Sequence, residues 1–424
     1  MEGNKILIGC IADDFTGAGD AASFLAKSGL RTILQNGVPA DVQLEERCDA
    51  VVIALKTRSV SPKEASEQTL RALQWLKRAG TKQFYIKYCS TFDSTPVGNI
   101  GPAVDIAIEF LDVPYTLLCP SLPTNGRTVK AGKLYVHGVP LERSSMRNHP
   151  LNPMWDSYIP ALMRGQSKYP CIVPDKSIEE NIGQRTGRFY LVPDYETDDQ
   201  GRQIVERFGH LPLLTGGSGL LEHLSAKVGS RSSEGDMDCG TSGRGIILCG
   251  SCSQMTSQQI EHFRSKGGAC IALDPQMLFT GKKHLEDLWE TVCNSQEPIL
   301  IYSTRPALLL GEKKDNSFDA AQVVERAMAE LGRRAVKTGF NRIIVAGGET
   351  SGAVMQAMRL NSFRVGPSIA PGVPVLIPVE QNEVRIVLKS GNFGQDDFFE
   401  RALSATARKR QSPQVSIQPG ISKE

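Results

Sequence analysis

The sequence predicts an α/β protein of two domains, each with a mostly parallel sheet flanked by helices. Apolar segments of strand length alternate with amphipathic helical segments along almost the whole chain, which is the pattern of repeated βαβ units. At 424 residues the chain is too long for one hydrophobic core of ordinary size. Residues 230–244 contain few apolar residues and many turn formers, so they predict a linker between the domains.

The N-terminal domain is expected to span residues 1–229. Its clearest helix lies within residues 61–80, because Ser61 can cap the start, Pro62 suits the first helical position and Gly80 suits the end. The segment from 121 to 190 is less regular and rich in Pro, Gly, Arg and His. The expected strands, in chain order, are KILIGCIA, TILQ, AVVIAL, FYIKYC, YTLLCP, FYLVPD and LPLLTGG.

The C-terminal domain is expected to span residues 245–408. A long amphipathic segment near residues 319–337 predicts a helix, and the basic segment 409–424 is expected to be a disordered tail. The expected strands are GIILCG, CIALDP, EPILIYST, RIIVAGG and VRIVLK.

The composition narrows the range of partners. The chain has 48 basic and 46 acidic residues, so we expect neither nucleic acid nor membrane as a partner. No apolar run approaches the ~18 residues of a membrane helix. Ten cysteines are dispersed, and the close pair Cys249 and Cys252 lacks the second pair of a zinc site. With no signal-like start, these features predict reduced thiols and a cytoplasmic location.

Three expected strand-to-helix turns of the C-terminal domain combine glycine with hydroxyl residues: GSCSQMT, AGGETSGAV and LKSGNFG. Free N–H groups and hydroxyls at a helix start can bind an anion, and turns of this kind gather at the carboxyl edge of a parallel sheet. Together they predict a nucleotide or phosphate site. The chain contains neither a Walker A sequence nor the protein-kinase motifs.

The segment GAGDAA, which begins at Gly17, fits a dinucleotide-binding pattern and makes an NAD-dependent sugar-acid dehydrogenase a rival interpretation. Two observations oppose it. Asp13 and Asp14 precede the glycines and would repel a pyrophosphate, and the next expected strand ends without an acid for the ribose.

The N-terminal domain is therefore predicted to bind the acceptor, the molecule that would receive a group from the nucleotide. Asp13 and Asp14 follow the first strand, Arg58 follows another strand, and Lys87 and Asp93 belong to the hydroxyl-rich segment KYCSTFDSTPVGNIG. Carboxylates accept hydrogen bonds from sugar hydroxyls, while Arg and Lys pair with a carboxylate, so the set suits a polyhydroxy acid. The alternative for Asp13 and Asp14 is a helix N-cap with a solvated neighbour. A non-catalytic sensor, which would bind a sugar acid without turnover, is a second rival interpretation of the function.

Seven motifs together resemble the four-carbon acid sugar kinase family, and the resemblance extends from residue 5 to about residue 405. They are ADDFTGAGD, STFDSTPVGNIG, NGRTV, MRNHPLNPM, GSCS, GGETSG and LKSGNFG. The forms CSTFDSTP and MRNHPLNPM are similar to the 3-oxo-tetronate kinase branch of that family. The resemblance implies an N-terminal sugar-acid domain, a C-terminal nucleotide domain, and ATP-dependent phosphorylation of O4 of a four-carbon sugar acid. A 3-oxo-tetronate is the substrate implied, with D-threonate or D-erythronate as the alternative.

The resemblance and the residue types assign expected roles, with ATP and Mg²⁺ as cofactors and the metal ligands left unassigned. Asp93 and Asp14 are the two candidates for the catalytic base. The sequence leaves a homo-oligomer possible. Candidate substrate-binding residues are Asp13, Arg58, Lys87, Ser94, Thr95, Asn99 and Arg127, and candidate nucleotide-binding residues are Ser251, Ser253, Gly347, Gly348, Glu349, Thr350, Ser351, Lys389 and Gly391.

Overall fold

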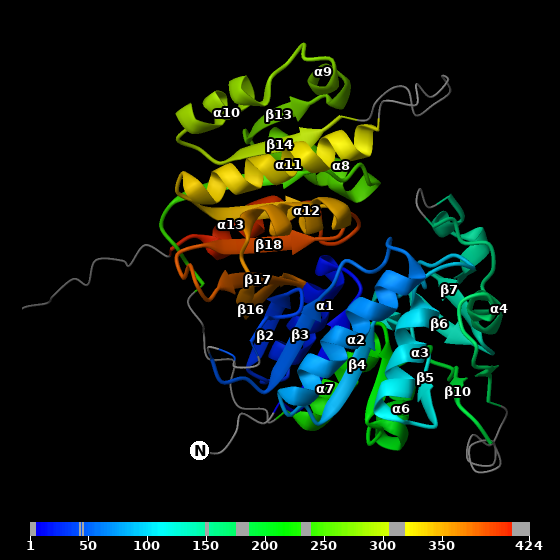
Figure 1. Cartoon of the computed structure of the whole chain (residues 1–424). Helices are drawn as coiled ribbons and strands as arrows, with labels where there is room; N and C mark the ends of the chain where they lie inside the picture. Colours follow the sequence, from blue (N-terminus) through cyan, green and yellow to red (C-terminus); the bar gives the residue numbers. More distant parts are fainter. Residues whose placement is uncertain are drawn as a thin grey trace, which may run out of the picture.

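A computed structural model describes residues 6–41, 44, 46–148, 152–174, 186–229, 239–304 and 319–408. Its main feature is one twisted, mostly parallel sheet of twelve strands (Figure 1). The predicted α/β class is confirmed. The expected tail at 409–424 and most of the expected linker lie outside the described residues.

The sheet has an N-terminal and a C-terminal half. In spatial order the N-terminal half contains β11 (Leu213–Gly216), β4 (Gln83–Lys87), β1 (Ile8–Ala12), β3 (Ala50–Ala54) and β2 (Thr32–Asn36). The C-terminal half continues with β16 (Ser362–Ala370), β17 (Val373–Pro378), β18 (Arg385–Lys389), β15 (Phe340–Ala346), β12 (Arg244–Cys249), β14 (Ile299–Ser303) and β13 (Ala269–Leu273).

Helices cover both faces of the sheet. In the N-terminal domain α2 (Pro62–Arg78) and α3 (Ile100–Leu111) pack on one face, and α1 (Phe15–Lys27) and α7 (Ser218–Val228) on the other. The predicted helix after Ser61 is confirmed, since the Ser61 side chain accepts a hydrogen bond from the Glu64 N–H. In the C-terminal domain α11 (Ala320–Lys337) and α12 (Gly348–Met358) cover one face, and α8 (Gln254–Ser265) and α13 (Phe398–Thr406) the other.

The less regular middle of the N-terminal domain forms two small sheets beside the main one. One has the order β5 (Tyr115–Leu117), β10 (Phe189–Leu191), β9 (Cys171–Ile172), and the other β6 (Arg127–Lys130), β7 (Lys133–Val136), β8 (Val139–Pro140). The remaining helices of the described residues are α4 (Ile159–Arg164), α6 (Asp198–Phe208), α9 (Pro275–Phe279) and α10 (Leu285–Asn294), with short 3₁₀ turns at Pro123–Asn125, Leu141–Arg143 and Ser145–Asn148. No helix in the described part of the chain is long and apolar enough to cross a membrane.

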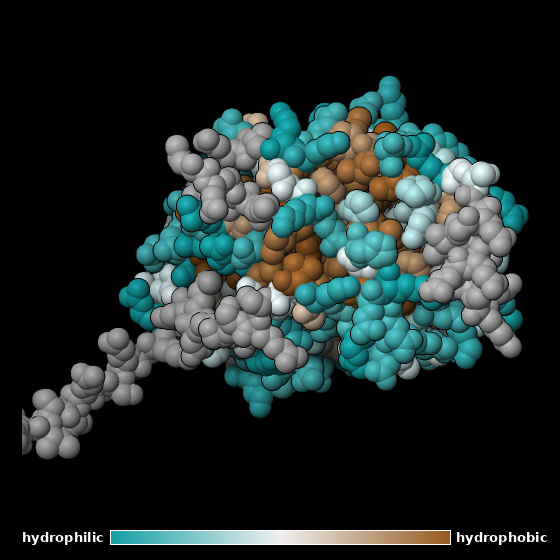
Figure 2. Space-filling model, turned by 90° about the horizontal axis from the view of Figure 1, so that it is seen from below, coloured by the Kyte–Doolittle hydropathy of each residue, from teal (hydrophilic) through white to brown (hydrophobic). Residues whose placement is uncertain are grey.

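The amino ends of the N-terminal strands form one end of the molecule. Leu7, Leu211 and Val228 line a shallow hollow there, together with polar groups such as Lys82 and His210. Seen from below, the molecule shows hydrophobic residues in the middle of a largely hydrophilic face (Figure 2). The charged cluster described below lies at the opposite, carboxyl ends of the same strands.

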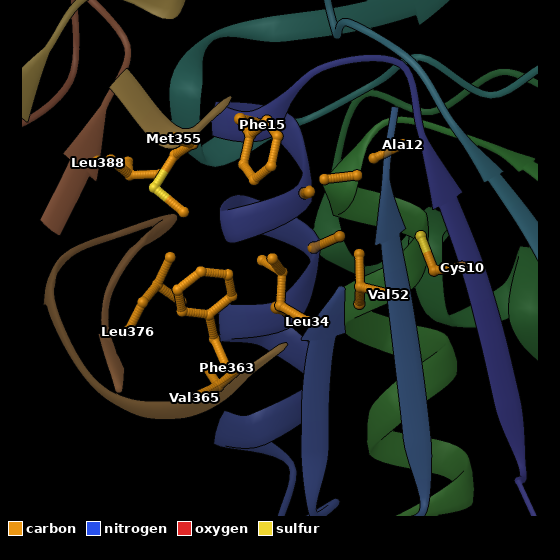
Figure 3. Packing of buried hydrophobic residues seen from close by; sticks show 14 of the residues in the cluster. Cys10, Ala12, Phe15, Leu34, Val52, Met355, Phe363, Val365, Leu376 and Leu388 are labelled. Atoms are coloured by element: carbon orange, nitrogen blue, oxygen red, sulfur yellow. The ribbon is translucent and has the colours of Figure 1, made fainter. Parts of the chain in front are cut away.

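The two halves of the sheet are joined by strand pairing, which the sequence did not predict. β2 pairs with β16 in the antiparallel sense, with Leu34 opposite Phe363. Each domain's sheet thereby covers an edge that would otherwise expose unpaired backbone groups. Figure 3 shows the core continuing across this junction, with Phe15 and Leu34 from one domain beside Met355, Phe363 and Leu376 from the other.

Residues 239–244, the last part of the expected linker, are fixed on the C-terminal domain. Cys239 and Thr241 are buried. The Thr241 N–H donates to the Thr406 carbonyl at 2.9 Å, and the Arg408 N–H donates to the Thr241 carbonyl at 3.1 Å.

Candidate active site

A cluster of charged side chains lies where β1, β3 and β4 end. These strands are parallel, so the residues that follow them meet at one edge of the sheet. Asp13 and Asp14 follow β1, Arg58 follows β3, Lys87 is the last residue of β4, and Asp93 comes from the segment after β4. We call these five residues the acceptor half-site.

Arg58 connects three of the carboxylates. Its guanidinium binds Asp13 with two hydrogen bonds, at 2.9 and 3.0 Å. Nη1 lies 2.7 Å from Asp14 Oδ2 and 3.8 Å from Asp93 Oδ2. Burial by itself would lower the pKa of Arg58, but Asp13 and Asp14 outweigh it and hold that pKa well above the ordinary value. Arg58 therefore stays charged and fixes the positions of these carboxylates.

Asp14 is the N-cap of α1. Its Oδ1 accepts from the Gly17 N–H and lies 3.4 Å from Thr16 Oγ1, while Oδ2 faces Arg58. The glycines of GAGDAA therefore lie inside a helix and do not form the turn that a dinucleotide site requires. Both oxygens of Asp14 are thus engaged by donors of the protein itself, which favours a structural role for this carboxylate.

Lys87 and Asp20 form a buried pair behind the acceptor half-site. Lys87 Nζ lies 3.7 Å from Asp20 Oδ2, and their side chains are only 4% and 7% exposed. Burial would lower the pKa of Lys87, but Asp20, Asp13 and Asp14 outweigh it and raise the pKa above the usual value. Burial raises the pKa of Asp13 and of Asp20.

Asp93 lines a narrow cavity with Asp13, Arg58 and Lys87. The cavity measures about 20 Å³, little more than one water molecule needs. The preceding residue, Phe92, is buried and has a φ of +51°, a conformation that bulky residues rarely adopt. Strained backbone of this kind is often found at functional sites. Asp93 therefore lies in a small cavity within the cluster, directly after a residue of unusual backbone conformation.

Several other candidate substrate-binding residues hold protein groups in place. Asn99 donates to the Thr57 and Val60 carbonyls at 2.7 Å each, and so fixes the loop that carries Arg58. The Ser94 hydroxyl donates to Gln166 Oε1 at 3.0 Å. Thr95 is half-buried beside it.

Arg127 is a partly exposed cation at the start of β6. It donates to the Asn125 carbonyl, while its Nε is buried without a hydrogen-bond partner. Burial lowers its pKa. The charge of Arg127 also acts on Cys89, which belongs to the segment between Lys87 and Asp93.

The three glycine-containing turns of the C-terminal domain meet at the ends of β12, β15 and β18. The Gly347 N–H donates to the Lys389 carbonyl at 2.9 Å, and the Ser251 N–H donates to the Ala346 carbonyl at 3.1 Å. Gly347 has a φ of +125°, which favours glycine. A Cβ on Gly391 would lie 2.5 Å from Ser251 Oγ, so only glycine allows these turns to pack this closely. We call this region the nucleotide half-site.

The helices that follow two of these turns differ at their first residues. At α8, Ser253 is the N-cap, since its Oγ accepts from the Thr256 N–H. At α12 the cap position is Gly347, and no side chain caps the helix. Thr350 and Ser351 in the first turn are buried, and Ser351 Oγ has no hydrogen-bond partner. The uncapped N–H groups of Gly348, Glu349 and Thr350 suit an anion.

Lys389 and Ser253 hold the third turn together. The buried Lys389 ammonium donates to Thr256 Oγ1 at 3.0 Å and to the Gly391 carbonyl at 3.1 Å. Ser253 Oγ donates to the same carbonyl at 2.6 Å. Burial lowers the pKa of Lys389 to about 8. In this structure, both residues hold the turn.

Contacts between the domains bring the two half-sites together. A Cβ on Gly348, at the start of α12, would lie 3.9 Å from Thr16 Oγ1 in the first turn of α1. Lys56, two residues before Arg58, lies 3.6 Å from Glu349 of α12. The uncapped helix start and the carboxylate cluster therefore face each other across the junction.

Sequence reasoning did not name several residues that support the site, and two of them, Gln166 and Gln259, belong to no motif. Thr256 and Gln259 both hold the third turn, Gln259 by donating to the carbonyls of Phe393 and Gln395. Gln166 binds Ser94 and also accepts from the Gly101 N–H at 3.2 Å. The sequence signal for Thr256 was its place at the end of the turn GSCSQMT, three residues after Ser253. Within the described residues, no group of three or more His, Cys, Asp or Glu side chains could hold a metal ion.

Comparison with protein families divides the chain into an N-terminal and a C-terminal part, as the two half-sites do. A family model described as a sugar-binding N-terminal domain matches residues 8–224, and one described as a nucleotide-binding C-terminal domain matches residues 246–399.

Full-length relatives are known from several bacteria. The 3-oxo-tetronate kinase of Haemophilus influenzae is 40% identical over 93% of this chain and 99% of its own length. The Salmonella typhimurium protein of the same name is 41% identical over 93% of this chain and 98% of its own. A crystal structure from Salmonella typhimurium LT2, described as a tRNA synthase, matches with a TM-score of 0.81 and 41% identity over 93% of this chain and 98% of that one. This chain therefore belongs to the four-carbon acid sugar kinase family.

Proposed function

We propose that this chain is an ATP-dependent kinase that phosphorylates the terminal O4 hydroxyl of a four-carbon acid sugar. The expected substrate is a 3-oxo-tetronate. The observation that carries the proposal is the facing of the two half-sites across the domain junction. An uncapped helix start suits the phosphates of a nucleotide, and the carboxylate cluster opposite suits a hydroxyl-bearing acceptor. The names of the relatives agree with this activity.

Phosphoryl transfer depends mainly on in-line positioning and on neutralisation of charge. The backbone N–H groups at the start of α12, with Thr350 and Ser351, would hold the phosphate groups. Ser251 and Gly391 would complete the cradle, because their turns pack against Gly347. Asp93 would orient the acceptor hydroxyl and take its proton.

The charge of the acceptor half-site bears on how the acid is oriented. Including Asp20, four carboxylates surround two cations, Arg58 and Lys87, so the region would repel the carboxylate of the substrate. We therefore assign the hydroxyl end of the substrate to this cluster and its carboxylate to Arg127, whose Nε has no partner. Arg58 would then orient Asp13, Asp14 and Asp93 rather than bind the carboxylate itself.

The proposal includes Mg²⁺, because ATP would bind as its Mg²⁺ complex. It commonly binds through one or two protein carboxylates together with phosphate oxygens and water, so it needs no three-residue cluster. Glu349, in the first turn of α12, is a partly exposed carboxylate at the right place. The metal would neutralise phosphate charge during transfer.

The test is ADP release with Mg-ATP across both 3-oxo-tetronates, D- and L-threonate, and D- and L-erythronate, with ³¹P NMR to locate the phosphate. We expect strong turnover with one four-carbon acid and phosphate on O4. Turnover with a threonate or an erythronate alone would assign the chain to the threonate or erythronate kinases. If no acid of the panel gave ADP release while ATP still bound, the substrate assignment would be overturned. NADH binding without ATP binding would instead favour a dehydrogenase.

A further inference from the structure

Lys56 crosses the domain junction between the two half-sites. It follows β3 in the N-terminal domain, and its Nζ lies 3.6 Å from Oε2 of Glu349 on α12 and 3.9 Å from Oε2 of Glu325 on α11. Both partners belong to the C-terminal domain. The ammonium is thus placed where a phosphoryl group would have to pass from one half-site to the other.

The contacts of Lys56 are weak enough to be exchanged. Its side chain is 40% exposed, and those of Glu349 and Glu325 are 42% and 31% exposed. Ion pairs of this length and exposure contribute little in water. Burial raises the pKa of Glu325, Lys56 opposes that rise, and Glu349 adds to it, so the two glutamates share one nearby cation.

A nucleotide at the start of α12 would change this balance. Its phosphates would lie beside the Glu349 carboxylate, and the Mg²⁺ proposed there would replace Lys56 as the cation that neutralises this carboxylate. Lys389 is held within its own turn by Thr256 and Gly391, and Arg58 is bound to Asp13 and Asp14. Of these three cations, Lys56 has the longest and most exposed contacts.

We propose that Lys56 is a catalytic residue that leaves Glu349 and Glu325 to contact the γ-phosphoryl group of bound ATP during transfer. The inference rests on the proposed kinase function. The acceptor O4 forms a bond to the γ-phosphorus while the bond to the β,γ-bridging oxygen breaks, and ADP departs with that electron pair. The O4 proton passes to Asp93. Lys56 remains protonated throughout and stabilises the charge that develops on the transferring group.

The first test compares Lys56→Ala and Lys56→Arg with wild type by steady-state kinetics. For Lys56→Ala we expect kcat to fall by about 10²- to 10³-fold, the usual cost of removing one charge-stabilising donor. The KM of the sugar acid should stay within about twofold. Lys56→Arg should recover at least a tenth of the lost activity, since it keeps the charge. A kcat of Lys56→Ala within threefold of wild type would overturn the proposal.

A charge swap separates catalysis from a simple bridge between the domains. In the double variant Lys56→Glu with Glu325→Lys the attraction across the junction is kept, but the cation moves to the other domain. We expect the swap to remain as inactive as Lys56→Ala, whereas recovery would show that only the bridge matters. The matched control is Lys27→Ala, because Lys27 is an exposed lysine at the far end of α1, paired with Glu222 at 3.4 Å. It should keep full activity.

A binding measurement keeps the inference testable apart from turnover. Calorimetry would give the affinities of ADP and of a non-hydrolysable ATP analogue, both with Mg²⁺, for wild type and Lys56→Ala. The variant should lose about tenfold affinity for the analogue and almost none for ADP. An unchanged ratio would overturn the role of Lys56. An inactive wild type that binds the analogue through Lys56 would overturn only the assigned acceptor.

Discussion

Two buried lysines end strands in the two halves of the molecule, and they differ in what surrounds them. Lys87 ends β4 and Lys389 ends β18, and their exposed fractions are 4% and 0%. Burial alone lowers the pKa of a lysine. At Lys87 the carboxylates of Asp20, Asp13 and Asp14 outweigh burial and raise the pKa. At Lys389 the partners are a hydroxyl and a carbonyl, and the pKa falls to about 8.

The difference follows from the charge of the proposed ligands. A nucleotide brings several negative charges, so a half-site for it is best held together by backbone N–H groups, hydroxyls and glycine turns. A sugar acid brings hydroxyls and a single carboxylate, so its half-site can contain several carboxylates balanced by Arg58 and Lys87. The nucleotide half-site relies on hydrogen bonds to uncharged acceptors, whereas the acceptor half-site relies on buried ion pairs. The two half-sites should therefore respond differently to substitution.

The largest effect is expected from Asp93→Asn. The amide keeps the size of the side chain but cannot take a proton, so kcat should fall by about 10³-fold, in the range for loss of a general base. Binding of the Mg²⁺ complex of the ATP analogue should change little, because Asp93 belongs to the acceptor half-site. Steady-state kinetics with the sugar acid, together with calorimetry for the analogue, would measure both.

The control for this substitution is Asp49→Asn. Asp49 pairs with Arg31 at the surface of the same domain, away from the cluster, so turnover should stay within about twofold of wild type. If Asp93→Asn kept its turnover and Asp14→Asn lost it, the base would be Asp14 and the argument from its capping role would be wrong.

The sequence predicted the local order of the site better than its long-range order. The three glycine turns and the sequence-adjacent Asp13 and Asp14 could be placed at strand ends, because strand-to-helix turns in parallel sheets meet at one edge. The pairing of Leu34 with Phe363 could not be predicted in this way, since the register of two strands more than three hundred residues apart leaves no local pattern.

The directions of side chains were the second feature of the site that the sequence could not predict. Residue type made Asn99 and Ser94 candidate ligands of the substrate, whereas the structure directs the Asn99 amide to backbone carbonyls and the Ser94 hydroxyl to Gln166. The same polar groups can bind a ligand or the protein itself, and only the fold decides which. The partners Gln166 and Gln259 show no motif because a single glutamine at a helix position has many ordinary uses.

The second prediction concerns the ion-paired lysine. Lys87→Met would leave Asp20 buried without its cation, which should lower the free energy of unfolding at neutral pH by about 3–5 kcal/mol. The raised pKa of Lys87 means that its stabilising effect is present below the unfolded-state pKa and is lost as the pH rises through the higher folded-state value. Urea unfolding at neutral pH would measure the loss. Lys87→Met combined with Asp20→Asn should recover part of it, and a double variant less stable than the single one would contradict the pairing.

The smallest effect is expected at Lys389, and it should have the opposite sign. A folded-state pKa of about 8, below the ordinary value of 10.5, means that burying the charged form opposes folding at neutral pH. Between about pH 8 and pH 10.5 the unfolded chain binds more protons than the folded one, so this penalty is relieved as the pH rises. Wild type should therefore gain stability relative to Lys389→Met over that interval, by up to about 3 kcal/mol.

The difference between the two unfolding profiles is the quantity to measure. Burial raises the pKa of Cys10 and Tyr88 in the folded protein, so these side chains titrate in this interval in the unfolded chain and affect both proteins alike. Removing the ammonium should leave the third turn in place, since the Gly391 carbonyl still accepts from Ser253 Oγ and Thr256 Oγ1. A difference that stayed constant with pH would show that the two hydrogen bonds of Lys389 compensate for its burial. A difference of the opposite sign would mean that the nucleotide half-site supplies a negative partner and resembles the acceptor half-site after all.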